Sequence, residues 1–368
     1  MSSEAEYLAI PAPDRAQHLW RYTPWHRIHP TGKPEEIPTE VSPAGVSLTM
    51  LDGSEPPKGV SVSVIDGNLT RNIDSDIGGA FIRALSQEGV VKISIDDGII
   101  IEQPLLLTVE STGSVSGIQI DVSVGANSQT ELITLIESGA DWFGLMRCGT
   151  IDKSAIFNDV VVNLLGDSKL LRIEQFTLLR DAQVKFGTVG SGGVQTKGDL
   201  RYILDGRGAN LQVNGSILSA GKQHNDHHVE IMHEELETFS RLKWHSTCGG
   251  KSRTIGTGML RIAQGAKGSD SAQVFNNLLL SKDAEADSIP ELEVLENEVV
   301  GCGHGTASGP VDDDQMFYLK TRGFSDNGAR GLLIAAFLNS TLNEMGSEKL
   351  HLWLIDILST EINENKTS

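Results

Sequence analysis

The chain has 368 residues, of which 39% are hydrophobic, so it is long enough to bury one large core or those of several ordinary domains. Its formal net charge of -19 argues against a nucleic-acid-binding surface, because phosphate binding depends on Lys and Arg side chains that neutralise the backbone. The same charge argues against a polybasic membrane anchor.

The distribution of apolar and cysteine residues gives an expectation for localisation. No apolar run approaches the roughly twenty residues that a membrane-spanning helix needs. The segment 1–4 has neither the basic start nor the apolar stretch of a secretory signal. The cysteines, Cys148, Cys248 and Cys302, are too few and too scattered for a disulfide framework in a chain of this length. We therefore expect a cytoplasmic protein.

Residues 1–88 are expected to form an N-terminal extension and a small mixed region of helix and strand. A polar segment with several prolines runs to about Pro43, and we interpret Trp20 and Trp25 within it as packing the extension onto the body of the protein. The segment 60–65 has the pattern of a strand. The segment 77–87 has the pattern of a helix with one apolar face, so we expect it to cover the edge of a core.

From residue 89 to about residue 305 the pattern is that of short strands. Apolar and polar residues alternate, as at Val91, Ile93 and Ile95, and clusters of Gly, Asn, Asp and Ser separate the runs. Further strands are expected within 118–124, 131–136, 160–165, 184–189, 200–204, 211–218 and 259–262.

The absence of long amphipathic helices in this region narrows the fold. A doubly wound α/β fold would need such helices between its strands, so it is excluded. The spacing of the strands is uneven and no blade motif recurs, which disfavours a propeller. The pattern alone leaves a β-sandwich and a β-helix as nearly equal alternatives.

Residues 306–368 have the pattern of a small helical domain. Asp312 and Gln315 form a capping pair for a helix that runs through Leu319, and Gly323 is expected to end this helix. Two apolar stripes at helical spacing follow. The first comprises Ala329, Leu332, Leu333, Ala336 and Phe337, and the second, after a Ser347 cap, comprises Leu350, Trp353, Leu354, Ile357 and Leu358.

The junction between the strands and the helices, residues 301–305, contains the candidate functional residues Cys302 and His304. Residues two apart in an extended backbone point to the same side, so this thiol and imidazole can face one partner or one metal ion. The ordinary alternatives are a buried small hydrophobe for Cys302 and a hydrogen-bonded strand-end residue for His304.

Several short motifs occur in a fixed order around this junction. They are Asn277-Leu278-Leu279-Leu280-Ser281, Pro290-Glu291-Leu292-Glu293, Cys302-x-His304-Gly305, Asp314-Gln315-x-Phe317-Tyr318-Leu319-x-x-Arg322-Gly323 and an Ala-Arg-x-Leu-Leu helix at 329–333. This order is similar to the C-terminal signature of the SufB/SufD family of iron-sulfur cluster assembly proteins. The resemblance implies a mainly β protein with a right-handed parallel β-helix core over 89–305, a small N-terminal α/β region over 1–88 and a C-terminal helical domain over 306–368.

The motifs resemble the SufD branch more than the SufB branch. The SufB pattern has a cysteine where this chain has Ser281, and a His-Glu pair where it has His304-Gly305. The SufD pattern carries the Cys-x-His-Gly that is present here. A single SufB-like scaffold that acts without a separate SufB is the alternative.

The resemblance implies a non-enzymatic scaffold subunit of the SUF iron-sulfur cluster assembly complex, with no catalytic residue of its own. It implies docking of a SufC-type ABC ATPase on the C-terminal helices, and pairing with a SufB-like subunit or a second copy through the edge of the β-helix. Cys302 and His304 are the candidate ligands of a nascent cluster or of iron at the subunit interface. The cluster or iron would be transient, and we expect no stably bound cofactor in the isolated chain.

A second group of candidate ligands lies at His224, His227, His228 and His233. Imidazoles are good ligands for zinc and iron, so a stand-alone metal-binding protein is an alternative function. Neighbours such as His227 and His228 point to opposite sides of a strand, however, so only a subset could converge. A β-helix carbohydrate-active enzyme, with acidic residues in a groove, is the other alternative.

Overall fold

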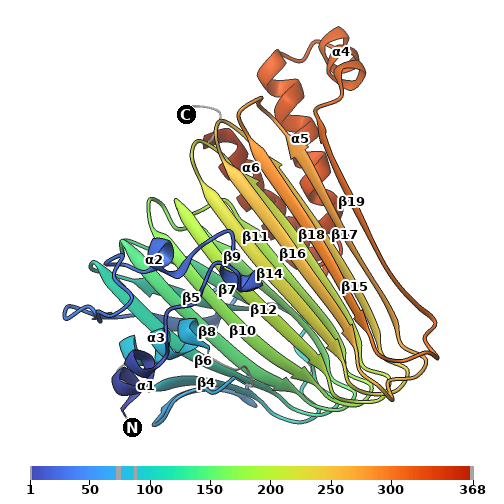
Figure 1. Cartoon of the computed structure of the whole chain (residues 1–368). Helices are drawn as coiled ribbons and strands as arrows, with labels where there is room; N and C mark the ends of the chain where they lie inside the picture. The colour runs from blue at the N-terminus through green and yellow to red at the C-terminus, as the bar shows by residue number, and fades with distance from the viewer. Residues whose placement is uncertain (1, 72–75, 87–88, 365–368) are drawn as a thin grey trace.

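The computed structural model describes residues 2–71, 76–86 and 89–364. The chain forms a parallel β-solenoid of about eight turns with helices near its two termini (Figure 1). Each turn contributes one strand to each of two sheets, and each strand pairs in parallel with the strand of the next turn, as β10 (Lys169–Leu178) does with β8 and β12. The parallel pairing confirms the β-helix and excludes the sandwich that the sequence pattern had left open.

The two sheets are named sheet A and sheet B. In spatial order, sheet A comprises β18 (Glu285–Val294), β16 (Arg253–Ile262), β14 (His224–His233), β12 (Gln195–Leu204), β10, β8 (Trp142–Ile151), β6 (Val115–Val124), β4 (Val90–Ile95) and β3 (Val60–Ile65), with β1 (Ser42–Pro43) beside β6. Sheet B comprises β19 (Gly301–Pro310), β17 (Asp270–Leu279), β15 (Phe239–Cys248), β13 (Asn210–Ser219), β11 (Gln183–Gly190), β9 (Ile156–Asn163), β7 (Gln129–Ser138), β5 (Leu105–Ser111) and β2 (Gly45–Met50).

The interior of the solenoid is the main hydrophobic core. Alternate residues of each strand point inward, and in the first turns these are almost all aliphatic, as Leu107, Ile120 and Ile136 show. Stacking of successive turns brings like side chains into columns, which removes their apolar surface from water. The first strands, β2 and β3, pair antiparallel with β5 and β4 and form the N-terminal end of the solenoid.

The N-terminal helices cover the outer face of sheet A. They are α1 (Ser3–Ala9), a 3-10 helix (His18–Trp20), α2 (Trp25–Ile28) and α3 (Ile77–Leu85). Trp25 packs edge-to-face against Phe81 of α3, which in turn packs against Trp142 of β8. The predicted packing role of Trp20 and Trp25 and the predicted helix at 77–87 are confirmed for the described residues.

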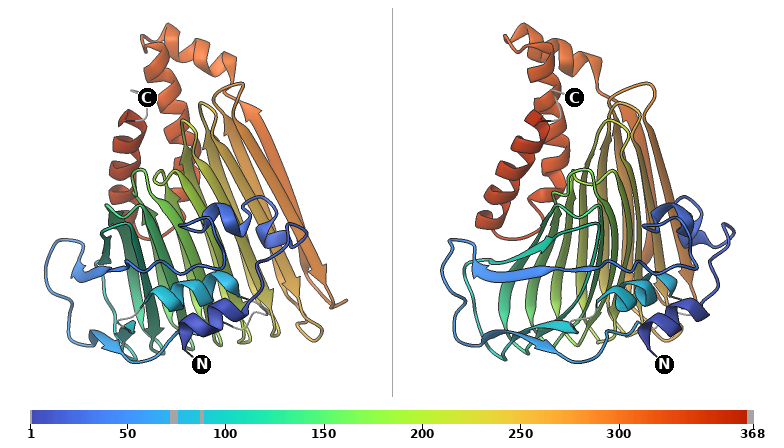
Figure 2. Two further views of the ribbon diagram at one scale, coloured as in Figure 1. Left: turned by 60° about the vertical axis from the view of Figure 1, so that its left-hand side comes forward. Right: turned by 90° about the vertical axis from the view of Figure 1, so that its left-hand side faces the viewer.

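The C-terminal helices are α4 (Asp313–Thr321), α5 (Asp326–Leu342) and α6 (Glu348–Glu364). Helices α5 and α6 lie on the outer face of sheet B, opposite the N-terminal helices, whereas α4 projects beyond the sheets (Figure 2). The Asp312 cap is confirmed, since its carboxylate accepts hydrogen bonds from the backbone amides of Asp314 and Gln315.

The predicted stripe of α6 is confirmed, but that of α5 is wrong in part. Leu332 is 45% exposed, and the residues of α5 that pack against sheet B include Ile334, Leu338 and Leu342. Helix α5 is apolar on more than one side, so the sheet that it meets, rather than its own pattern, selects the buried face.

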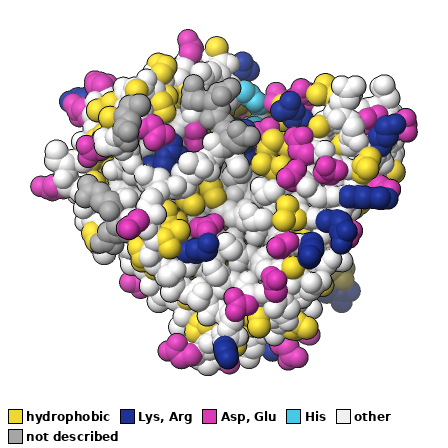
Figure 3. All heavy atoms as spheres, turned by 90° about the horizontal axis from the view of Figure 1, so that it is seen from below, with side chains coloured by type: hydrophobic (Ala, Val, Ile, Leu, Met, Phe, Trp, Pro, Cys, Tyr) yellow, Lys and Arg dark blue, Asp and Glu magenta, His cyan; other side chains and the backbone are white. Residues whose placement is uncertain are grey.

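The lower face of the molecule is chemically mixed. Viewed from below, it shows apolar side chains interspersed with acidic and basic ones and no field of a single charge sign (Figure 3). None of the helices in the described part of the chain combines the length and the apolar character that a membrane span requires.

Candidate functional site at the open end of the solenoid

The last turn of the solenoid is formed by β18 and β19. In the described part of the chain, each of these strands has a strand neighbour on one side only, namely β16 and β17. Their outer edges therefore carry backbone amides and carbonyls that no further turn of the ladder pairs. This open end is where the candidate residues Cys302 and His304 lie.

Cys302 and His304 both stand on the inward side of β19. Cys302 lies beside Ser271 of β17, and His304 lies beside Gln273. Cys302 is half-buried and packs against the interior core, whereas His304 is exposed at the open end. The structure thus places the thiol and the imidazole on one side, as their spacing predicts.

The environment of Cys302 affects its reactivity. Burial is the main cause that raises the pKa of its thiol, and the charge of Asp270 raises it further. The thiol is therefore protonated at neutral pH in the isolated chain. Binding to a thiophilic metal would release this proton, because thiolate is the ligand form of cysteine.

A column of polar side chains lies under Cys302 in the interior. The ring of His233 is hydrogen-bonded to Ser240, with 2.8 Å between Nε2 and Oγ, and Ser240 is bonded to Ser271 across 2.7 Å. Cys302 is the next residue of this column. The interior of the last turns therefore differs from the aliphatic interior of the first turns.

Gln273, beside His304, has a buried acceptor. Its Nε2 donates to the backbone carbonyl of Glu291 across 2.9 Å, but its Oε1 has no hydrogen-bond partner among the residues that the structure describes. This oxygen occupies space left by Gly258, where a Cβ atom would lie 1.9 Å from it. Buried acceptors are costly when unsatisfied, so this oxygen is a polar feature of the interior below the last turn.

The four candidate histidines of β14 do not share one site. His224 and His228 point outward, whereas His227 and His233 point into the solenoid, since their register partners alternate in the same way. Burial and the charge of Arg172 lower the pKa of His227 to about 3. Among residues 2–71, 76–86 and 89–364, no group of three or more His, Cys, Asp or Glu side chains is placed to hold a metal ion.

Sequence reasoning missed a buried ion cluster in the middle of the solenoid. Arg147 is fully buried and contacts Asp159 across 2.5 Å and Glu174 across 2.9 Å. Arg172 also contacts Glu174 across 2.9 Å. Burial alone would raise the pKa of Glu174, but the two arginines lower it overall. The only signal in the sequence was that these charges occupy inward positions of the alternation.

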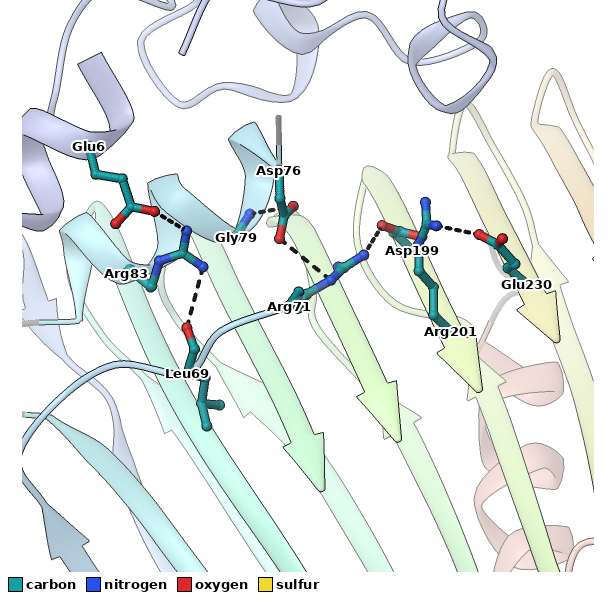
Figure 4. Close-up of polar contacts among 9 residues, drawn as sticks. All are labelled: Glu6, Leu69, Arg71, Asp76, Gly79, Arg83, Asp199, Arg201 and Glu230. Carbon is teal, nitrogen blue, oxygen red and sulfur yellow. Dashed lines mark hydrogen bonds and ion pairs between the residues drawn. The ribbon is translucent and has the colours of Figure 1, made fainter. Parts of the chain in front are cut away.

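The N-terminal segment crosses the outer face of sheet A and is held there by polar contacts. Arg71 contacts Asp76 and Asp199, and Arg201 links Asp199 to Glu230 (Figure 4). Burial opposes ionisation of Asp199, but Arg201 and Arg71 lower its pKa overall.

Further along the same face, the N-terminal segment reaches the candidate histidines and the last turn. The Thr23 hydroxyl donates to Asp226 across 2.6 Å and lies 2.9 Å from the Nε2 of His224. His18 contacts Glu291 of β18 across 3.0 Å. The contact with Thr23 gives His224 a structural role.

Comparison with known proteins agrees with the motifs and with the fold. The model of the SUF system FeS cluster assembly SufBD core domain matches residues 107–337. An iron-sulfur cluster assembly SufBD family protein of Mycobacterium leprae is 28% identical over 190 residues, which is 50% of this chain and 48% of that protein. The iron-sulfur cluster assembly protein SufD of Escherichia coli is 25% identical over 370 residues, which is 92% of this chain and 86% of that protein.

A SufBD family protein of Mycobacterium tuberculosis is 30% identical over 172 residues. The matches span about half the length of these mycobacterial relatives or less. The chain belongs to the SufBD family of iron-sulfur cluster assembly proteins. Within that family it is a homologue of SufD.

Proposed function

We propose that this chain is a non-enzymatic scaffold subunit of a cytoplasmic SUF complex, and that its open end forms half of an iron or cluster site. A SufB-like subunit pairs with β18 and β19 and supplies the remaining ligands. His304 donates an imidazole nitrogen, and Cys302 assists once a thiophilic metal displaces its proton. A second copy of the chain is the alternative partner at this end.

One observation supports this proposal above the others. Cys302 and His304 lie two residues apart on the terminal strand β19. In the described part of the chain, the outer edges of β18 and β19 have no strand partner. An added strand from a partner would satisfy the free backbone groups and cover His304. The same step would bring the partner's side chains close to Cys302 and His304.

The C-terminal helices supply a surface for the SufC-type ATPase. Helix α4 projects from the solenoid, and the aromatic side chains of Phe317, Tyr318 and Phe324 are 70%, 56% and 46% exposed. Exposed aromatic clusters of this kind are typical of protein interfaces. A groove between α4, α5 and the loop after β17 lies next to this surface.

A capture experiment tests the partners. The tagged chain, with and without residues 311–368, is mixed with purified SufC-type ATPase and SufB-like subunit. We expect the full chain to bind both, and the truncated chain to lose the ATPase while it keeps the SufB-like subunit. The proposal would be contradicted if the full chain failed to bind the ATPase, or if it failed to bind the SufB-like subunit.

The full-length double variant Phe317→Ser/Tyr318→Ser controls for misfolding of the truncated chain. It removes the two exposed aromatics of α4 and leaves the buried Met316 in place, and we expect it to lose the ATPase selectively.

A further inference from the structure

The opposite end of the solenoid carries an edge strand of unusual composition. Strand β3, Val60-Ser61-Val62-Ser63-Val64-Ile65, lies at the end of sheet A, and its only strand partner in the described part of the chain is β4, with which it pairs antiparallel. It contains no charged residue and no proline, the features that ordinarily protect an edge strand from association. Val62 and Val64 are nevertheless 43% and 65% exposed. Strand β18, at the other end of the same sheet, has four acidic residues and Pro290.

The free backbone groups of β3 belong to its valines. Gly59 precedes the strand, and its carbonyl accepts a hydrogen bond from the amide of Asp96 on the β4 side. Backbone groups in an antiparallel ladder alternate between the two edges, so those of Ser61 and Ser63 face β4 and those of Val62 and Val64 face outward. The amide of Val60 is bonded to the Pro57 carbonyl.

The valine side chains of β3 point toward the interior of the solenoid. Val62 lies opposite Ile93, and Val64 lies opposite Val91, both of which belong to the interior core. Directly opposed residues of an antiparallel pair share one face of the sheet. The exposed valines are therefore an uncovered continuation of the core.

Within β3, the sequence of residues 60–64 is symmetric about Val62. A second copy of β3, placed antiparallel and centred on Val62, sets Val60 against Val64 and Ser61 against Ser63. In this register the outward-facing groups of Val62 in the two copies bond to each other, and the Val64 amide of each copy bonds to the Val60 carbonyl of the other. The register therefore uses the backbone groups that are free.

The same register pairs opposite charges at both ends of the strand. It places Lys58 of each copy against Asp66 of the other. The two-fold axis between the copies makes these two contacts equivalent. Lys58 and Asp66 are exposed, and neither has an ion-pair partner within the part of the chain that the structure describes.

We propose that two copies of this chain associate through β3 in the antiparallel register centred on Val62, with reciprocal Lys58 and Asp66 pairs. Sheet A then continues from one copy into the other, and the exposed valines of both copies cover each other. This interface lies at the N-terminal end of the solenoid, so it leaves the open C-terminal end free. The proposal does not rest on the function proposed above.

Disulfide trapping tests the register. In a Cys148→Ser/Cys302→Ser background, which removes the two half-buried native thiols, Val62→Cys is compared with Ser63→Cys. In the proposed register, residue 62 of one copy faces residue 62 of the other at a Cα separation of ~5.5 Å, within the range that a disulfide bridges. Residue 63 of one copy faces residue 61 of the other, so the two residues 63 lie too far apart for a disulfide. We expect covalent dimer from Val62→Cys only.

Charge reversal tests the pairing in solution. Sedimentation at micromolar concentrations measures the monomer-dimer equilibrium of the full chain, of Lys58→Asp, of Asp66→Lys and of the double variant. We expect each single reversal to weaken the dimer about tenfold, since like charges then oppose at two places, and the double reversal to restore it.

Three results would overturn the proposal. They are a wild-type chain that stays monomeric at the highest concentration, a dimer that neither single reversal weakens, and equal trapping of Val62→Cys and Ser63→Cys.

Discussion

The two ends of the solenoid are built from the same ladder but present opposite chemistry. At the N-terminal end, the inward column of β3 consists of valines that stack on Val91, Ile93 and Ile95. At the C-terminal end, the inward residues of β19 include Cys302, His304 and Ser308. At both ends, the terminal strand is held to the preceding strand by backbone hydrogen bonds, which do not depend on the side chains. The side chains are therefore free to differ between the two ends.

This difference assigns separate tasks to the two ends. Aliphatic columns stabilise the first turns by removing apolar surface from water. Polar columns contribute less to stability but place hydrogen-bond donors and acceptors, with the candidate ligands Cys302 and His304, at the open end. Substitutions and pH should therefore affect the two ends in different ways.

The largest expected effect is that of acid on the polar interior. Burial lowers the pKa of His227 to about 3 and that of His233 to about 4, from 6.5. The unfolded chain takes up these protons below pH 6.5 and the folded chain does not. Stability is therefore complete above pH 6.5 and falls as pH drops toward 4, by ~2.7 kcal/mol per pH unit for the two groups.

Urea unfolding between pH 7 and pH 4.5 measures this slope, and His227→Gln isolates one histidine. Other groups titrate in the unchanged chain and in the variant alike. The contribution of His227 is therefore the difference between the pH dependences of their free energies of unfolding. We expect it to be ~1.4 kcal/mol per pH unit, the value for one proton. Identical slopes would show that His227 is not buried in its neutral form.

Leu107→Ala tests the aliphatic interior. Leu107 is fully buried in the interior core, and its truncation removes apolar contacts and leaves a cavity between neighbouring turns. We expect a loss of about 3 kcal/mol in the free energy of unfolding, measured by urea denaturation. The exposed Leu352→Ala, on α6, serves as the control and should change stability little.

Ser271→Ala tests the polar column under Cys302. The hydroxyl of Ser271 is buried and bonded to that of Ser240. We expect a loss of about 1 kcal/mol, because one buried hydrogen bond is removed and little volume is lost. A loss as large as that of Leu107→Ala would show that the last turns depend on packing as strongly as the first.

His304→Ala should have the smallest effect on stability and a large effect on function. The side chain is exposed, so we expect the free energy of unfolding to change by less than about 0.5 kcal/mol. Cluster assembly by the complex reconstituted with its SufB-like partner and ATPase should fall strongly. Unchanged assembly would contradict the role proposed for His304, and His26→Ala, which replaces an exposed histidine on α2 away from the open end, provides the matched control.

Much of the local structure could be predicted from the sequence. The strand at 60–65 and the cap at Asp312 follow from residue types within a few positions of one another. The opposite directions of His227 and His228 follow from strand alternation in the same way. The junction at Gly301 proved to be the first half of a strand that continues to Pro310, because its glycines carry little strand propensity of their own.

The long-range arrangement could not be predicted from local pattern. Arg147 and Glu174 are 27 residues apart and meet only because successive turns stack in register. Each looks like an ordinary solvated charge in its own segment. The choice between a sandwich and a β-helix depended on the family resemblance for the same reason, since strand pairing two elements apart leaves no local signal.

The N-terminal segment over sheet A has a consequence for the order in which the chain folds. Thr23 finds Asp226 only across 203 residues, and His18 contacts a strand that is synthesised later still. Contacts of such long range form late, because the intervening chain must be ordered first. On the ribosome, this segment therefore emerges long before it can dock, and the outer face of β14 stays uncovered until the solenoid is nearly complete.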